Sequence, residues 1–231
     1  MLQYLTKAVN FNDMEERRAL LPVLQDEIRA CTRCQDAGYI PEARPLTTGD
    51  PDAKFMVIGQ APSRTAHETH TFYRGPAGEK LRSWFVQAGF SHEDFGTRVY
   101  LAAITKCFPG RVPGSSTDRL PSRAEQALCR PWLDQEIALL QPRVIVLFGG
   151  LAIKTFLSAA PLRELVGRTF TKDGVVYVPV PHSSGASTWL NEPANRALLA
   201  QAIERLRETR EEFTPSNEFA ATEITKPAFA G

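Results

Sequence analysis

Four short apolar runs constrain the fold of this 231-residue chain more than any other feature. They stand at residues 54–59, 99–104, 143–148 and 175–180, and each is nearly continuous rather than an alternation of apolar and polar residues. Strands that are buried on both faces read this way, as they do in parallel sheets covered by helices. Helical patterns separate the runs, so the sequence predicts an α/β domain with a mostly parallel sheet.

The clearest helical pattern covers residues 14–30. Leu20, Leu24 and Ile28 recur on one side of this segment, and charged residues occupy the other side. Further helices are expected around the apolar runs, at residues 79–88, 122–140, 150–158 and 194–207.

Length and composition set the broad class of the protein. A chain with 43% hydrophobic residues can form one domain with a sizeable core, which we place at residues 1–212. The tail, residues 213–231, has few large apolar side chains and is expected to be disordered. No apolar run is long enough to cross a bilayer, and residues 1–7 lack a signal-peptide pattern. We therefore expect a cytoplasmic monomer without a membrane partner.

Charge is nearly balanced over the whole chain, with a formal net value of +1. It is sorted locally, because basic residues outnumber acidic ones within residues 106–130 while the segment after Leu206 is richer in Glu. A near-neutral total can therefore hide a basic face suited to nucleic acid. A solvated surface without a partner is the alternative.

The four cysteines form one close pair and two distant singles. Cys31 and Cys34 enclose two residues, and Cys107 and Cys129 follow far downstream. In a reducing compartment, thiols grouped in this way bind a soft metal centre more readily than they form disulfides. Spacing alone leaves three alternatives open: a structural zinc ion, a [4Fe–4S] cluster, or four free buried thiols.

Two loops are expected at the edge where ligands of parallel sheets bind, beyond the carboxyl ends of the strands. They are residues 59–78 and residues 181–191. Together with the cysteines they contribute a series of short motifs, which read GQAP at 59–62, FYRGPAG at 72–78, KC at 106–107, CRPWL at 129–133 and PHSS at 181–184. Over residues 20–207 this order resembles the iron–sulfur uracil-DNA glycosylases, the part of the uracil-DNA glycosylase superfamily that includes families 4 and 5.

The resemblance implies a three-layer α/β/α sandwich with a four-stranded parallel sheet. It also implies a [4Fe–4S] cluster of structural role, bound by Cys31, Cys34, Cys107 and Cys129. The implied activity is that of a monofunctional DNA-repair glycosylase, which hydrolyses the N-glycosidic bond of uracil in DNA and leaves an abasic site. Its partner is then DNA that contains uracil, with the target nucleotide flipped into a pocket.

The chain departs from the family pattern at functional positions. Gln60 and Ser63 stand where the first motif of the family has Glu and Gly. Ala103 stands where the family has the Asn that reads uracil, and Ser183 stands where it has Pro. Two alternatives stay open for this reason: a non-catalytic iron–sulfur protein that binds DNA, and a glycosylase for another deaminated base such as hypoxanthine.

Three side chains are candidates for catalysis. His182 follows the fourth apolar run and is expected to donate to uracil O2, where negative charge develops as the bond breaks. Gln60 is expected to position water or the base, because an amide is a poor proton acceptor. Glu68, with His67 as an alternative, is the candidate general base.

Substrate-binding residues are expected in the same loops. Tyr73 is a candidate to stack on the extruded base, and the backbone N–H groups of Ala61 and Ser63 are candidates to bind the base or a phosphate. Ser184, with Ser187, is expected to contact DNA phosphates. The basic candidates for phosphate contacts are Arg64, Arg74, Lys106 and Arg111.

Overall fold

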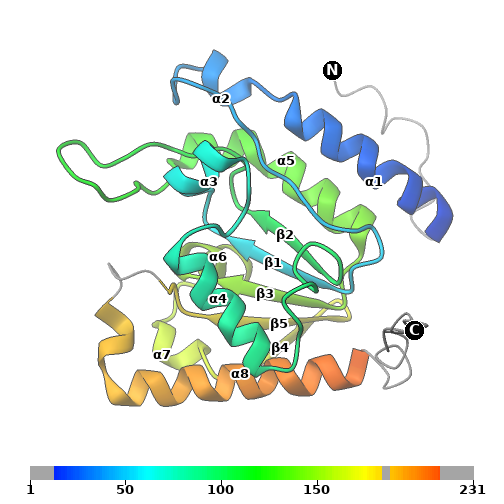
Figure 1. Cartoon of the computed structure of the whole chain (residues 1–231), viewed down its shortest axis with the longest axis vertical. Coiled ribbons are helices and arrows are strands. Elements are labelled where there is room, and N and C mark those ends of the chain that lie inside the picture. The colour runs from blue at the N-terminus through cyan, green and yellow to red at the C-terminus, as the bar shows by residue number, and fades with distance from the viewer. Residues whose placement is uncertain (1–12, 184–187, 214–231) are drawn as a thin grey trace, which may run out of the picture.

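In the structure, a computed structural model that describes residues 13–183 and 188–213, helices cover both faces of one central sheet (Figure 1). Helices α1 (Met14–Arg29), α5 (Arg123–Leu140) and α6 (Gly150–Phe156) pack on one face. Helices α4 (Pro76–Gln87) and α8 (Pro193–Phe213) pack on the other. The shorter helices are α2 (Arg33–Asp36), α3 (Arg64–Thr69), α7 (Leu162–Leu165) and the 3₁₀ turn η1 (Thr188–Asn191).

The sheet has five strands in the order β2-β1-β3-β5-β4. The four expected strands form and pair in parallel: β1 (Phe55–Gly59), β2 (Val99–Ala103), β3 (Val144–Phe148) and β5 (Val175–Val180). The expected count of four is wrong, because β4 (Phe170–Lys172) adds an antiparallel edge strand.

Strand β4 escapes sequence analysis because three residues are too few to show a period. The signal that reveals it is the turn that follows. Asp173 and Gly174 both have left-handed backbone, with φ of 52° and 78°. A two-residue Asp-Gly turn with positive φ at both positions joins antiparallel strands without disturbing their twist.

Burial on both faces explains why the parallel strands read as continuous apolar runs. In β3, Val144, Val146 and Phe148 enter the core shared with α4 and α8. Ile145 and Leu147, which alternate with them, enter the core shared with α1, α5 and α6. Because successive side chains point to opposite faces, β1, β2 and β3 are buried along their whole length, and β5 is buried in its second half.

The ends of the long helices follow from capping and from continued burial. Asp13 starts α1, because its carboxylate accepts the backbone N–H groups of Glu15 and Glu16. Helix α8 continues to Phe213, beyond the expected end at residue 207, because Thr209 and Phe213 still pack against the core. The expected tail, residues 213–231, lies outside the described residues apart from Phe213.

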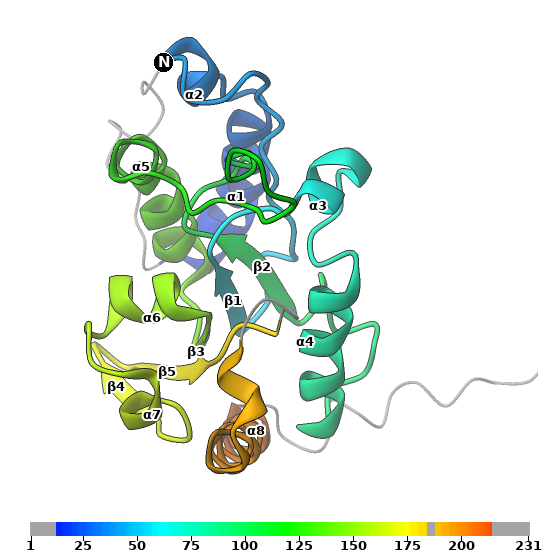
Figure 2. The ribbon, with the colours of Figure 1, turned by 90° about the vertical axis from the view of Figure 1, so that its left-hand side faces the viewer.

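All four parallel strands end at the same edge of the sheet. Figure 2 looks at this edge, where α3, the long loop of residues 104–122 and the chain after β5 come together. Within the described residues, no helix is both long and apolar enough to cross a membrane.

Candidate functional site

A cavity of about 470 Å³ opens at the carboxyl ends of the parallel strands. Gly59, Ala103 and Phe148 line it from the last positions of β1, β2 and β3, and His182 lines it just after β5. The volume is typical of sites for small ligands. The edge at which the cavity opens is the one where parallel sheets bind ligands.

Six of the expected site residues lie in the wall of this cavity: Gln60, Ala61, Ser63, Tyr73, Arg74 and His182. The structure thus brings the loops after β1 and β5 together, as their positions in the sequence indicate. The fold settles the location of these residues, and their individual roles remain proposals.

The structure does not bring Glu68 or Arg64 into the cavity wall. Both side chains are exposed on α3, where Arg64 Nε lies 2.6 Å from Glu68 Oε1. His67, the alternative base, also lies outside the wall, with its Nε2 atom 3.5 Å from a carboxylate oxygen of Glu42. Ser184 and Ser187 fall outside the described residues.

His182 is held by an aromatic neighbour. Its ring stacks on Phe148 with centroids 4.8 Å apart and an angle of 25° between the planes. Gly149 has a φ of 90°, which favours glycine. A Cβ there would also come within 3.3 Å of the imidazole, so a side chain would crowd the ring. Burial lowers the pKa of His182, and the negative charge of Asp118 offsets only part of this effect. The imidazole is therefore neutral at pH 7.

Ser183 has a structural contact that explains its presence after His182. Its buried hydroxyl donates to the carbonyl oxygen of Ala77 at 2.6 Å. This bond joins the end of β5 to the first turn of α4. Proline, which the resemblance leads one to expect here, has no hydroxyl and could not make it.

Tyr73 is fixed against the end of β1 in a conformation that needs two glycines. Its φ of 53° is left-handed, and its hydroxyl donates to the carbonyl oxygen of Ala102 at 3.4 Å. A Cβ at Gly59 would lie 2.7 Å from that hydroxyl, and one at Gly78 would lie 1.9 Å from the carbonyl oxygen of Tyr73. The ring also meets Phe148 edge-on at 5.9 Å. Burial raises the pKa of Tyr73, so its phenol is neutral and can act as a donor.

Gln60 and Ala103 define the polarity of the wall at the ends of β1 and β2. The Gln60 side-chain nitrogen lies 3.5 Å from the carbonyl oxygen of Arg119, a weak hydrogen bond. Ala103 is fully buried and offers no side-chain donor or acceptor. The end of β2 therefore offers no side-chain amide where the resemblance leads one to expect one.

Sequence analysis misses one polar contribution to the cavity, which comes from the loop between β2 and α5. Ser116, Thr117, Asp118 and Arg119 line the cavity from this loop. The loop has no periodic pattern, and only the tertiary fold brings it over the strand ends. The excess of basic over acidic residues in this region is visible in the sequence, but it does not single out Asp118.

The four cysteines line a second, smaller cavity, to which Thr105 and Lys106 of the chain segment after β2 also contribute. Cys31 lies just before α2 and Cys34 within it, while Cys107 comes from the loop after β2 and Cys129 from α5. All four are free thiols. The fold thus collects sulfur atoms from three segments that are distant in the sequence.

Hydrogen bonds to the sulfur atoms fit thiolates bound to a metal centre. The indole N–H of Trp132 donates to Cys31 Sγ at 3.3 Å, and the backbone N–H of Lys106 donates to Cys129 Sγ at 3.2 Å. Such bonds tune metal-bound sulfur. Burial raises the pKa of Cys107 to about 12 and that of Cys129 to about 11, so without a cation both remain thiols. Across residues 13–183 and 188–213, no three His, Cys, Asp or Glu side chains are placed to hold a single metal ion.

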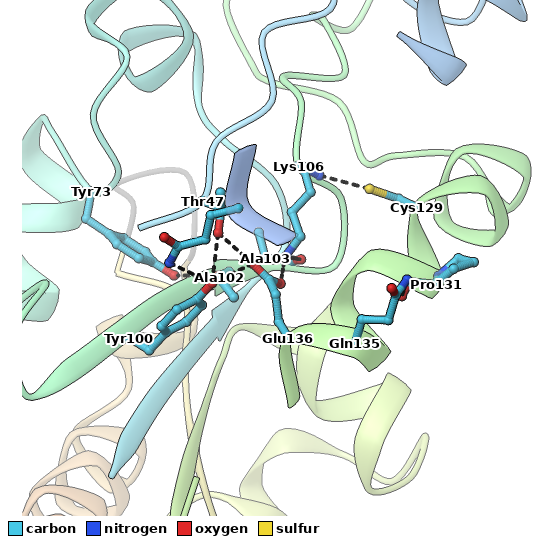
Figure 3. Close-up of polar contacts among 11 residues, drawn as sticks. Thr47, Tyr73, Tyr100, Ala102, Ala103, Lys106, Cys129, Pro131, Gln135 and Glu136 are labelled. Atoms are coloured by element: carbon cyan, nitrogen blue, oxygen red, sulfur yellow. Dashed lines mark hydrogen bonds and ion pairs between the residues drawn. The ribbon is translucent and has the colours of Figure 1, made fainter. Parts of the chain in front are cut away.

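A buried ion pair lies between the two cavities. Lys106 and Glu136 have exposed fractions of 1% and 0% and form a salt bridge. Glu136 also accepts the hydroxyls of Thr47 at 2.7 Å and Tyr100 at 3.0 Å, as Figure 3 shows. Lys106 Nζ donates in addition to the carbonyl oxygen of Ala103 at 3.2 Å. The expectation that Lys106 contacts DNA phosphates is therefore wrong, because its ammonium group is completely buried and paired.

The fold and the site together define an α/β protein with a ligand-sized cavity at a strand-end edge and a cysteine-lined cavity beside it. The sequence profile of the uracil DNA glycosylase superfamily matches residues 46–207, and the chain belongs to this superfamily.

Several relatives are named type-4 uracil-DNA glycosylase. The one from Pyrobaculum aerophilum is 31% identical over 156 residues, which cover 68% of this chain and 71% of that protein. The one from Sulfurisphaera tokodaii is 23% identical over 197 residues, covering 81% and 84%. A third, from Thermotoga maritima, is 26% identical over 144 residues, covering 62% and 69%. The expected family is thereby confirmed.

Proposed function

We propose that this chain is a monofunctional DNA glycosylase that hydrolyses the N-glycosidic bond of uracil in DNA and leaves an abasic site. The observation that carries the proposal is the strand-end cavity, whose wall includes a half-buried histidine, an amide and an aromatic ring in a chain of this superfamily. A base stacked inside a duplex cannot reach such a cavity, so the target nucleotide has to be flipped out.

The chemistry follows from where charge develops. As the bond to the sugar breaks, the sugar gains positive charge and the departing uracil gains negative charge that reaches its O2 atom. The neutral imidazole of His182 donates to that oxygen in this proposal, and its stacking on Phe148 supports the role because it restricts how the ring is oriented. Gln60 supplies an amide for the base or for water, and Tyr73 supplies the wall against which the base packs.

A strand-break assay tests the proposal. A duplex with a single uracil is incubated with the protein and then treated with alkali, which cleaves DNA at abasic sites. We expect a break at the uracil and none in a matched duplex with thymine. An intact uracil strand, with a known uracil-DNA glycosylase active in parallel, would contradict the proposal.

Ala103 favours a second candidate function, the removal of a larger deaminated base such as hypoxanthine. A methyl group at the end of β2 cannot select uracil through a side-chain amide. The same assay with hypoxanthine and xanthine duplexes separates the two functions. Breaks at hypoxanthine that exceed those at uracil would support the second.

We also propose that the four cysteines hold a [4Fe–4S] cluster. The support is that their sulfur atoms line one cavity and that two of them accept hydrogen bonds, while the resemblance supplies the identity of the group. When bound, such a group supplies cross-links between the segments that carry its ligands. Here these cross-links would join α2, the loop after β2 and α5, and would thereby support the end of β2 at the strand-end cavity.

Replacing one cysteine should remove the cluster. In Cys107→Ser, we expect loss of the brown colour and of most bound iron and sulfide, because a serine hydroxyl is a poor ligand for iron. Thr32→Ala is the matched control, since it changes an exposed side chain between Cys31 and Cys34. Iron and sulfide analysis of both purified proteins gives the answer. Stoichiometric zinc in a colourless wild type would contradict the cluster.

The lowered pKa of His182 predicts the pH dependence of excision. A lowered pKa means that the imidazole loses its proton at a lower pH, so the neutral donor persists down to and below the ordinary histidine value of about 6.5. Single-turnover rates should therefore stay level between about pH 8 and pH 6.5. A fall in rate centred near or above that ordinary value, absent from His182→Ala, would contradict the neutral donor.

A further inference from the structure

Asp118 is the only carboxylate among the described residues that line the strand-end cavity. Hydrolysis needs a group that holds the attacking water and accepts its proton, and the amide of Gln60 cannot accept one. Glu68, the acid expected for this task, lies outside the cavity wall in an exposed ion pair with Arg64. The proposed reaction thus requires a base, and the cavity contains one candidate.

The loop that carries Asp118 is anchored close to this residue. Asp118 pairs with Arg111 as an antiparallel bridge. The next residue, Arg119, places its two terminal nitrogens 2.7 and 2.8 Å from the two carboxylate oxygens of Glu125. Glu125 is itself buried in the first turn of α5. Bidentate pairs of this kind fix geometry as well as charge, so the position of Asp118 is defined by the fold.

The carboxylate of Asp118 has one oxygen engaged and one available. Oδ2 accepts the backbone N–H of Arg64 at 3.3 Å. Within the part of the chain that the structure describes, no hydrogen bond engages Oδ1. The charge of Asp118 acts on His182, whose pKa it raises against the larger effect of burial. Gln60 contacts the carbonyl oxygen of Arg119, the residue after Asp118, and Gln60 and Asp118 line the same cavity.

We propose that Asp118 is the catalytic base of this site, a role that rests on the proposed glycosylase function. The Asp118 carboxylate accepts one proton from a water molecule that the amide of Gln60, in the wall of the same cavity, helps to hold. The water oxygen forms the new bond to C1′ of the deoxyribose as the bond from C1′ to the base breaks. The bonding electron pair leaves with the base, whose O2 is stabilised by His182, and the proton on Asp118 returns to solvent.

Asp118→Asn tests this role with little risk to the fold, because asparagine keeps an oxygen that can accept the N–H of Arg64. Two quantities are measured for the wild type, Asp118→Asn and Asp118→Ala. The first is the single-turnover rate of uracil excision. The second is the Kd for a duplex that contains 2′-fluoro-2′-deoxyuridine, whose glycosidic bond resists cleavage. Asp26→Asn is the matched control, since Asp26 is exposed on α1 and pairs with Arg29.

We expect both Asp118 variants to be slower by at least about 100-fold, the usual contribution of a general base. Their Kd values should be unchanged or lower, because removing a negative charge does not weaken binding to phosphates. Asp26→Asn should match the wild type. A rate for Asp118→Asn within about tenfold of the wild type would overturn the inference. So would a loss of rate explained by weaker DNA binding. If the wild type releases no uracil, the proposed function fails and the inference fails with it.

Discussion

Glu136→Gln should lower the free energy of unfolding by about 3–5 kcal/mol, because it leaves the buried ammonium group of Lys106 without a counter-charge. Glutamine keeps the shape of the side chain and one oxygen that can accept the hydroxyls of Thr47 and Tyr100. The loss is therefore specific to charge. Guanidinium denaturation of the variant and the wild type, followed by circular dichroism, measures it.

Two further variants isolate the cause of that loss. Glu204→Gln removes an exposed partner of Arg207 on α8 and should change stability by less than about 1 kcal/mol. The double variant Lys106→Met/Glu136→Gln removes the ammonium as well, and it should recover at least about half of the lost stability. If Glu136→Gln were no more destabilised than Glu204→Gln, removing the counter-charge of Lys106 would not have the cost that we assign to it.

His182→Ala should lower the single-turnover rate of uracil excision by about 10²–10³-fold, the usual consequence of losing one donor to a developing negative charge. Affinity for DNA should change much less, because the donor acts mainly on charge that appears in the transition state. His182→Gln, which can still place an N–H near Phe148, should retain more activity than His182→Ala.

His92→Ala is the matched control for this experiment, because His92 is exposed and lies outside the cavity wall. It should excise uracil at the wild-type rate. If His182→Ala excised uracil at the wild-type rate, His182 would not be the donor that we propose. A parallel loss in His92→Ala would show that the assay responds to general damage rather than to the site.

The parallel part of the fold is predictable from sequence because burial on both faces makes each strand a continuous apolar run. Residues such as Val146 and Leu147 enter opposite cores, so each parallel strand has to be apolar throughout. The edge strand β4 has only three residues, and its burial is partial. It therefore shows no continuous apolar run in the sequence, and only the Asp173-Gly174 turn indicates it.

The site is predictable where it lies at strand ends and unpredictable where a loop reaches it. His182 and Gln60 follow strands directly, so the sheet alone determines that they meet. Asp118 reaches the same cavity from a loop, which Arg119 helps to anchor to α5. For Lys106 the sequence predicts a role that the fold excludes. A basic residue near a ligand site suggests phosphate binding, but Lys106 is buried and paired with Glu136.

The measurement that most directly tests the central claim is the amount of free uracil released at an excess of protein over duplex. Mass spectrometry counts the free base, and alkaline cleavage counts the abasic sites in the same sample. The account predicts equal amounts of the two, approaching the amount of duplex supplied. Tight binding of the uracil duplex, with uracil still in the strand and no free base, would contradict it and favour a protein that binds DNA without catalysis.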